Sequence, residues 1–323
     1  WLKWQEWALE HGRGRLRPQG EASHGPVWAQ GRHTRLAPYH TATSMVLLVS
    51  QEVLAKPPSQ EDGVTAETEE QLRNFGAGLI QGAGLLLRLP QLTVASAAAL
   101  FQRFYFRRSF AEFEVRAVAG ASLALACKLE ETHRTLKDVI IVVHRLQMRA
   151  LQEEGEPAYA GRPAPALDAA SKEFGEAKQE ALRAERSILR ELGFDVTTFL
   201  DPPHKYVLQY MNALKFPNTL LQKAWSYLND ALRTKLCCTH QPDHIALASL
   251  FLASRALGVR LPEEPPWWEA FNVQVQSLKD IAQAIAALYG KPPGEHVAVP
   301  RRKNNPVALE CPAKSPADED PAE

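Results

Sequence analysis

Residues 113–131 read FEVRAVAGASLALACKLEE, and this stretch determines the fold class that the sequence predicts. Between Val115 and Leu129 almost every residue is Ala, Val, Leu, Gly, Ser or Cys, so a helix formed here is apolar around most of its circumference. Such a helix must be surrounded by others, and its small residues let neighbouring helices approach closely. About fifteen residues are too few to cross a membrane, which takes about 20. The stretch therefore predicts the central helix of an all-α domain.

The same pattern occurs a second time in the chain. Residues 122–128, SLALACK, align with residues 249–255, SLFLASR, at a separation of 127 positions. At the same separation, residues 86–90, LLRLP, align with residues 213–217, ALKFP, without a gap. Chance similarity between two Leu- and Ala-rich helices is the alternative, and the shared proline argues against it. A repeat of this length predicts a duplicated domain and not a solenoid.

The composition agrees with two domains and with protein partners. A chain of 323 residues can form two cores of ordinary size, and 45% of the residues are hydrophobic. Lys and Arg together number 37, as do Asp and Glu, so no net charge favours nucleic acid or anionic lipid. We expect no direct nucleic-acid binding and no membrane segment. No signal peptide is visible, although the chain starts at Trp1 and not at Met, so its natural start can lie further upstream.

The cysteines and catalytic motifs argue against a metal centre and an active site. Cys127, Cys237, Cys238 and Cys311 form no CxxC pair, which predicts neither a zinc site nor a disulfide framework and fits a reducing compartment. No GxGxxG, GxxxxGK[ST], HExxH or GxSxG motif occurs. His240 and His244, four residues apart near a predicted helix start, have no third ligand nearby. We therefore predict no catalytic residue, no metal and no cofactor.

Five helices are predicted in each repeat from apolar residues at helical spacing. Those of the first repeat, residues 69–200, are 68–90, 93–108, 113–131, one that starts near 135, and 166–192. Those of the second repeat, residues 201–290, are 204–215, 220–236, 243–257, 267–271 and 275–289. The whole is a tandem of two five-helix domains.

Local signals set several of these boundaries. Thr68 and Gln71 have the spacing of a capping box at the start of the first helix. Thr93 is the predicted N-cap of the second helix. Gly193 is the predicted C-cap of the fifth helix, after which Phe194 returns to the core.

The segments outside the helices are predicted to be irregular. Residues 1–68 form an N-terminal extension in which 1–40 show no sustained period, 43–54 form a helix or strand, and 59–68 form an acidic linker. Residues 153–165 read as a solvated insertion loop. The tail 291–323, rich in Pro, Lys and acidic residues, is predicted to be disordered.

One pair of charges next to the predicted core requires an explanation. Lys128 ends the most apolar helix, and Glu185 lies in the long fifth helix one turn before Ile188 and Leu189. Charges beside a core are rare unless they are paired. One hypothesis is an internal ion pair that ties the third helix to the fifth. The other is that both charges face outward and hold backbone groups of a partner.

The order and spacing of several segments resemble a cyclin, and the repeats resemble two cyclin boxes. Residues 126–131, ACKLEE, close the third helix, and residues 185–194 follow the pattern E-x-x-I-L-x-x-L-x-F. The chain is most similar to the L-type transcription and splicing cyclins, over roughly residues 69–289. The segments that carry this similarity are 85–91, 101–105, 184–186, 191–194, 203–205, 224–234 and 253–257.

The resemblance implies a regulatory subunit and not an enzyme. Cyclins bind a serine/threonine kinase and press its αC helix inward, so that the Lys and Glu around ATP pair. By motif, Lys128 and Glu185 match the family's kinase-binding lysine and glutamate, with Leu129, Leu189 and Phe194 as apolar neighbours. The family acts on the RNA polymerase II machinery and splicing factors, which implies nuclear localisation and transcription or splicing factors as further partners.

Two departures and two alternatives accompany the resemblance. Residues 301–323 carry no Arg-Ser repeats, which L-type cyclins usually have, and the first helix lacks the substrate-docking motif of cell-cycle cyclins. One alternative is a general transcription factor of the TFIIB type, which would show a basic face and a zinc ribbon, and the sequence shows neither. The other is a cyclin-fold scaffold without a kinase, which a buried Lys128–Glu185 pair would favour.

Overall fold

The computed structural model describes residues 46–301 except 154–166, 195, 197–199, 215, 262–266, 272 and 292–293. All regular elements in this part of the chain are helices, and no β-strand occurs among the described residues. The predicted all-α fold class is confirmed. The predictions for residues 1–40, for the loop at 154–165 and for the tail beyond 301 lie outside the described residues.

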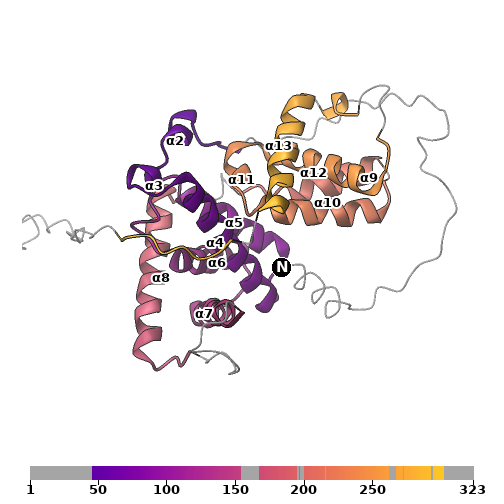
Figure 1. The fold of residues 1–323 in the computed structure, drawn as a ribbon. Coiled ribbons are helices and arrows are strands. Elements are labelled where there is room, and N and C mark those ends of the chain that lie inside the picture. The colour runs from indigo at the N-terminus through magenta and orange to yellow at the C-terminus, as the bar shows by residue number, and fades with distance from the viewer. Residues whose placement is uncertain are drawn as a thin grey trace, which may run out of the picture.

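The first repeat is built around helix α6, Val115–Leu129. Residues 118–127 are all buried, which covers every face of this helix. Figure 1 shows α6 among the four helices that it contacts, which are α4 (Ala66–Leu86), α5 (Gln91–Phe104), α7 (Leu136–Glu153) and α8 (Lys172–Glu191). The Glu114 carboxylate caps α6 by accepting hydrogen bonds from the backbone N–H groups of Arg116 and Ala117. Most of the buried apolar side chains of this repeat form one core, and a smaller cluster lies between α7 and α8.

The second repeat has its own core around α12, Pro242–Leu257. Its other helices are α9 (His204–Leu214), α10 (Asn218–Ala231), α11 (Leu236–Thr239) and α13 (Val275–Ala287), with 3₁₀ turns η3 (Glu269–Phe271) and η4 (Leu288–Gly290). Two predictions need correction. The helix expected at 267–271 is only the turn η3, and the helix expected at 220–236 is divided into α10 and α11. The division lies at Thr234, whose hydroxyl accepts a hydrogen bond from Leu236 N.

The helix boundaries keep the 127-residue separation seen in the sequence. Helix α5 starts at Gln91 and α10 at Asn218, and each is preceded by a proline as N-cap. Helix α6 starts at Val115, and α12 starts 127 residues later at Pro242. The sequence repeat is therefore also a repeat of helix position.

Three predicted helix starts are corrected by the caps in the structure. Helix α4 starts about one turn earlier than predicted, because its N-cap is Thr65 and not Thr68. The Thr65 hydroxyl accepts a hydrogen bond from Thr68 N. Thr93 lies inside α5, fully buried, with its hydroxyl 3.2 Å from Thr132 Oγ1. Helix α8 starts at Lys172, where Ser171 accepts a hydrogen bond from Phe174 N.

The segment before the first repeat contacts both repeats. It contains two short helices, α2 (Gln51–Ala55) and α3 (Pro58–Glu61), so the predicted helix is displaced toward the C-terminal end of 43–54 and the linker at 59–68 is partly helical. Val46 exchanges two hydrogen bonds with the Gln241 side chain of the second repeat. Ser59 accepts one from Phe110 N of the first. Residues 46–65 are therefore part of the folded unit.

The start of the C-terminal tail also differs from the prediction. Residues 294–301 are extended and lie against the first repeat, where Val297 and Val299 pack on its core. Because two valines at alternate positions give an extended strand one apolar side, this short piece can be ordered without a helix.

The two repeats meet through side chains that bind main-chain and amide groups. Asn229 is the centre of one cluster of hydrogen bonds. Its main-chain carbonyl oxygen accepts from Gln81 Nε2 at 2.9 Å, and its side-chain Oδ1 accepts from Gln91 Nε2 at 2.8 Å. His204 Nε2 lies 3.0 Å from the same Oδ1. Gln102 Nε2 reaches across from α5 to the carbonyl of Arg233 at 3.2 Å.

We expect the folded protein to lose stability as the pH falls below about 6.5. Burial lowers the pKa of His204, and the hydrogen bond between His204 and Asn229 offsets this decrease only in part. Burial and the nearby His244 lower the pKa of His240. The unfolded chain then binds more protons than the folded chain, so the stability present above pH 6.5 declines as the pH drops, by at most about 1.4 kcal/mol per unit for each histidine. Urea unfolding between pH 7.5 and 5.5 measures this slope. His204→Gln, which cannot titrate, should reduce the slope, and an unchanged slope would exclude His204 as its source.

Two glycines of α4 should respond to alanine in opposite ways. A Cβ on Gly76 would lie 2.1 Å from Phe101 Cζ, whose ring is fully buried, whereas a Cβ on Gly78 would meet nothing within 4 Å. Gly78→Ala should stabilise the fold by up to about 1 kcal/mol through helix propensity. Gly76→Ala should produce a net loss of about 1 kcal/mol or more, because overpacking outweighs that gain. Thermal unfolding of the two variants checks the contrast, and equal effects would show that the ring can move aside.

Candidate functional site

The two charges identified in the sequence lie together where α6 ends beside α8. Lys128 Nζ donates to Glu185 Oε1, and the two groups form an ion pair. The Lys128 side chain is 59% exposed and that of Glu185 only 12%. This corrects one part of the sequence hypothesis, because Glu185 does not face outward and the internal pair of the alternative is formed. The reason is the position of Glu185 between the buried Ala184 and Ile188, where its carboxylate loses water and needs a cation.

The pair leaves part of its hydrogen-bonding capacity unused. Glu185 Oε2 is buried and has no hydrogen-bond partner in the described part of the chain. An ammonium group has three donors, and Lys128 uses one of them on Oε1. The exposed Lys128 therefore offers its remaining donors at the surface, whereas the second carboxylate oxygen of Glu185 is covered. The lysine can bind a carbonyl of a second molecule directly, and the glutamate can accept an N–H once its side chain turns toward the surface.

Three apolar residues predicted to accompany the pair differ in exposure. Leu129 and Leu189 are half-buried and pack against the first core. Phe194 is 70% exposed, which corrects the prediction that it returns to the core. An exposed phenylalanine costs hydration free energy, so its position at the end of α8 requires an explanation.

The end of α8 holds Phe194 in this exposed position. Gly193 N bonds to the carbonyl of Arg190, and Phe194 N bonds to that of Leu189 at 2.8 Å, which is the Schellman pattern. Gly193 has the left-handed φ of 73° expected for that cap, and Phe194 itself has φ 61°. A left-handed backbone is uncommon for an aromatic residue. The cap thus orients the ring away from the domain.

One ion pair at this end of α8 has no signal in the sequence. Arg108 Nη2 lies 2.6 Å from Glu191 Oε1, and the two residues are 83 positions apart. Partial burial would lower the pKa of Arg108, but the hydrogen bond and the charge of Glu191 raise it overall. This contact fixes the last turn of α8 against the segment that follows α5, and with it the position of Phe194.

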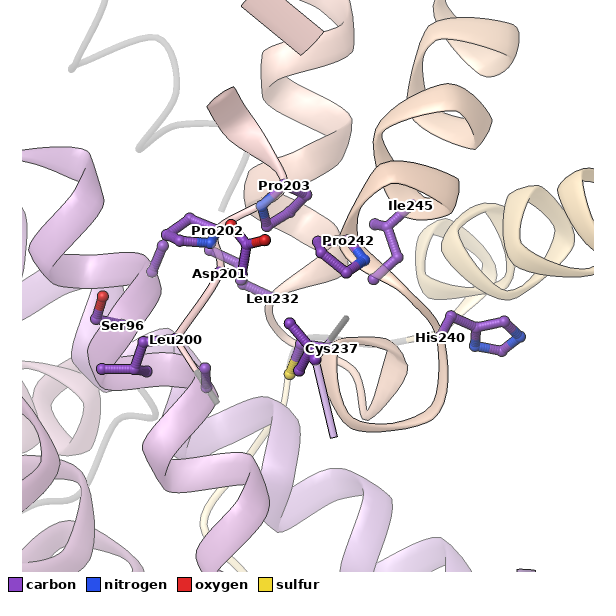
Figure 2. Close-up of a pocket in the computed structure, with 13 residues that line it drawn as sticks. Ser96, Leu200, Asp201, Pro202, Pro203, Leu232, Cys237, His240, Pro242 and Ile245 are labelled. Carbon is purple, nitrogen blue, oxygen red and sulfur yellow. The ribbon is translucent and has the colours of Figure 1, made fainter. Parts of the chain in front are cut away.

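The cavity between the repeats is small, and the described residues contain no cluster of metal ligands. A cavity of about 20 Å³ lies between the repeats, and Figure 2 shows Ser96, Leu200, Cys237 and Pro242 among the residues that line it. That volume has room for about one water molecule. No group of three or more His, Cys, Asp or Glu could hold a metal among the described residues. His240 caps the end of α11 and is not on the helix that carries His244, so the predicted histidine pair is not a helical one.

Comparison with known proteins identifies the family. The pattern of the cyclin N-terminal domain matches residues 44–197. This chain is a member of the cyclin family, most similar to the L-type cyclins. Cyclin-L1-1 of Arabidopsis thaliana is 39% identical over 251 residues, which are 78% of this chain and 58% of the relative. Human Cyclin-L1 is 38% identical over 245 residues, 75% of this chain and 44% of the relative. The chain thus spans about half the length of these relatives.

Two solved complexes contain a chain with the same fold. A chain of the yeast RNA Pol II CTD kinase CTDK-1 complex matches with a TM-score of 0.60 and 20% identity, over 75% of this chain and 72% of that one. A chain of the Chaetomium thermophilum CAK complex matches with a TM-score of 0.50 and 18% identity, over 69% and 65%. At these identities the likeness concerns the fold alone. Among the described helices, none has the length and apolar character needed to cross a bilayer.

Proposed function

We propose that this cyclin is the regulatory subunit of a cyclin-dependent serine/threonine kinase that acts in RNA polymerase II transcription and pre-mRNA splicing. The observation that carries the proposal is the Lys128–Glu185 pair, placed where α6 and α8 meet, with unused hydrogen-bonding capacity on both side chains. The chain itself is a regulatory subunit and not an enzyme, as its membership of the cyclin family indicates.

The geometry supports a specific way of holding a kinase. On binding, the Glu185 side chain turns outward so that its buried Oε2 accepts a backbone N–H of the kinase, and Lys128 keeps its bond to Oε1 while it donates to a kinase carbonyl. Leu129 and Leu189 are neighbours of the charged residues, and Phe194 supplies an exposed aromatic anchor at the end of α8. A partner helix held at this point is pressed toward the kinase active site, which aligns the Lys and Glu that bind ATP.

The choice of pathway rests on the relatives. The L-type similarity favours transcription and splicing over cell-cycle control, and residues 78–84, GLIQGAG, lack the docking motif of cell-cycle cyclins. We place the chain in the nucleus on the same ground.

Purification of the tagged full chain from cells of its source tests the proposal. A serine/threonine kinase should co-purify, and its activity on a peptide of RNA polymerase II C-terminal repeats should fall when the chain is depleted. Recovery of the chain without kinase activity would reject the proposal. Specific retention on promoter DNA would instead favour the TFIIB-type alternative, for which the balanced charge of 37 against 37 gives no support.

A further inference from the structure

The end of the described chain crosses the first repeat as an extended strand that belongs to no β-sheet. Figure 1 shows this yellow segment, residues 294–301, running past α4 and α6 toward α8. It follows directly on the second repeat, whose last helical turn is η4. The chain therefore returns from the second repeat to cover part of the first.

The strand contacts three elements of the first repeat in turn. Lys291, just before it, pairs with Glu70 of α4 at 2.6 Å. The His296 ring meets Phe75 of α4 edge-on, with centroids 5.5 Å apart, and its Nε2 lies 3.6 Å from Oε1 of Glu114, the cap of α6. Arg301 Nη1 donates to Glu180 Oε1 of α8 at 3.0 Å.

Residues 297–300 of the strand alternate between an inward and an outward side. Val297 and Val299 are half-buried on the first core, whereas Ala298 between them and Pro300 after them are exposed. Alternation with period two is what an extended peptide shows when one side lies on a surface. The surface of the first repeat therefore favours apolar side chains at positions 297 and 299.

The strand also comes into direct contact with the backbone of α4. A Cβ on Gly294 would lie 2.6 Å from Phe75 N and 2.9 Å from Asn74 C. Because these are backbone atoms of a helix, they cannot move aside. Only glycine fits at this approach.

We propose that this surface, formed by α4, the start of α6 and α8, is a binding site for an extended peptide whose occupant is the chain's own segment 294–301. This assignment rests on the glycine fit, the two inward valines, the pair of Arg301 with Glu180 and the pair of Lys291, just before the segment, with Glu70. Bound in this way, the segment is a clasp that joins the end of the second repeat to the helices of the first.

The clasp bears on kinase binding, and this consequence rests on the function proposed above. Helices α6 and α8 are the elements that carry Lys128 and Glu185. Glu180 precedes Glu185 on α8 by five residues, about one and a half turns. By contacting α8 and the cap of α6 at once, the clasp holds the two helices in the relative position that pairs the charges.

Hydrogen exchange of the full chain tests the clasp without a kinase. The double variant Val297→Asp/Val299→Asp should release the strand and increase amide exchange in the first turns of α6 and in α4 by about tenfold. The matched control is Ala298→Asp, which adds a charge to the same strand on its exposed side and should leave exchange unchanged.

Gly294→Ala should increase amide exchange as the double variant does, without any added charge. Gly290→Ala, whose Cβ meets nothing within 4 Å, should leave exchange unchanged. Equal exchange in all of these variants would overturn the proposal.

Peptide binding tests the site itself. A labelled peptide of residues 291–302 should bind the full-length Val297→Asp/Val299→Asp variant, measured by fluorescence anisotropy, and reverse its faster exchange. The same peptide with Asp at 297 and 299 should bind about tenfold more weakly or not at all, and the peptide with Asp at 298 should bind normally. No binding of the native peptide would overturn the proposal. The double variant should also bind the kinase more weakly, and added native peptide should restore this binding. If the native chain binds no kinase, the proposed function is wrong, but the hydrogen-exchange and peptide-binding tests of the clasp remain valid.

Discussion

Replacing Arg73 with methionine is expected to lower the free energy of unfolding by about 3–5 kcal/mol, the largest effect that we expect from a single substitution. The Arg73 side chain in α4 is 4% exposed and pairs at 2.8 Å with Glu69, which is 7% exposed. Its guanidinium also donates to the carbonyls of Gln102 and Tyr105 at 2.9 and 3.0 Å. Methionine fills much of the space but leaves the Glu69 carboxylate buried without a cation. The two carbonyls lose their donor as well.

Urea unfolding of the full chain measures this effect, and two further variants identify its cause. Adding Glu69→Gln to Arg73→Met removes the unpaired charge and should recover part of the loss, since much of the cost comes from the buried carboxylate. Lys291→Ala breaks the pair with Glu70, whose side chain is 56% exposed, and should cost less than about 1 kcal/mol. An Arg73→Met variant as stable as the native chain would show that Glu69 finds water or another partner.

Arg73 illustrates what the sequence could not predict about the core. Apolar spacing in α4 identifies the buried face, but Arg73 occupies that face as a charged residue and has no signal of its own. Its partners Gln102 and Tyr105 lie 29 and 32 positions away and come close only when α4 packs on α5. Long-range polar contacts of this kind depend on the tertiary fold and not on local spacing.

The helical framework, in contrast, was predictable because it depends on local composition. A helix with an apolar circumference must be surrounded by others. The 127-residue separation relates the start of α5 to that of α10 and the start of α6 to that of α12. Helix caps were less predictable, since Thr65 and Thr68 are both suitable residues and only packing decides between them. The clasp was missed because two valines separated by one residue are too short a pattern to be distinguished from an irregular tail.

The candidate site was predictable in its residue types but not in its geometry. A lysine at the end of an apolar helix and a glutamate beside apolar residues stand out in the sequence. Whether they face each other or a partner depends on how α6 crosses α8. Nothing in the spacing of Lys128 and Glu185 decides that. Phe194 was ambiguous for the same reason, because the cap that exposes it is a backbone feature.

Glu185→Ala should weaken binding of the kinase by about 2 kcal/mol or more while leaving the fold nearly as stable as before. The substitution removes the acceptor oxygens, and the exposed Lys128 that remains can be solvated at little cost. Lys128→Ala should weaken binding to a similar extent but should also destabilise the fold by about 1–3 kcal/mol. It leaves the mostly buried carboxylate of Glu185 without a partner on either oxygen.

Affinity for the co-purified kinase and thermal unfolding of the free chain, measured on the same two variants, separate kinase binding from a purely structural role. In a scaffold without a kinase, Lys128→Ala would lower the melting temperature, and neither variant would lose affinity for any kinase. Phe194→Ala provides a control at the same surface, because its ring is 70% exposed and its loss should affect binding without destabilising the fold. If Glu185→Ala binds the kinase as well as the native chain does, then the carboxylate serves only to tie α6 to α8, and the assignment of this pair to the kinase interface is wrong.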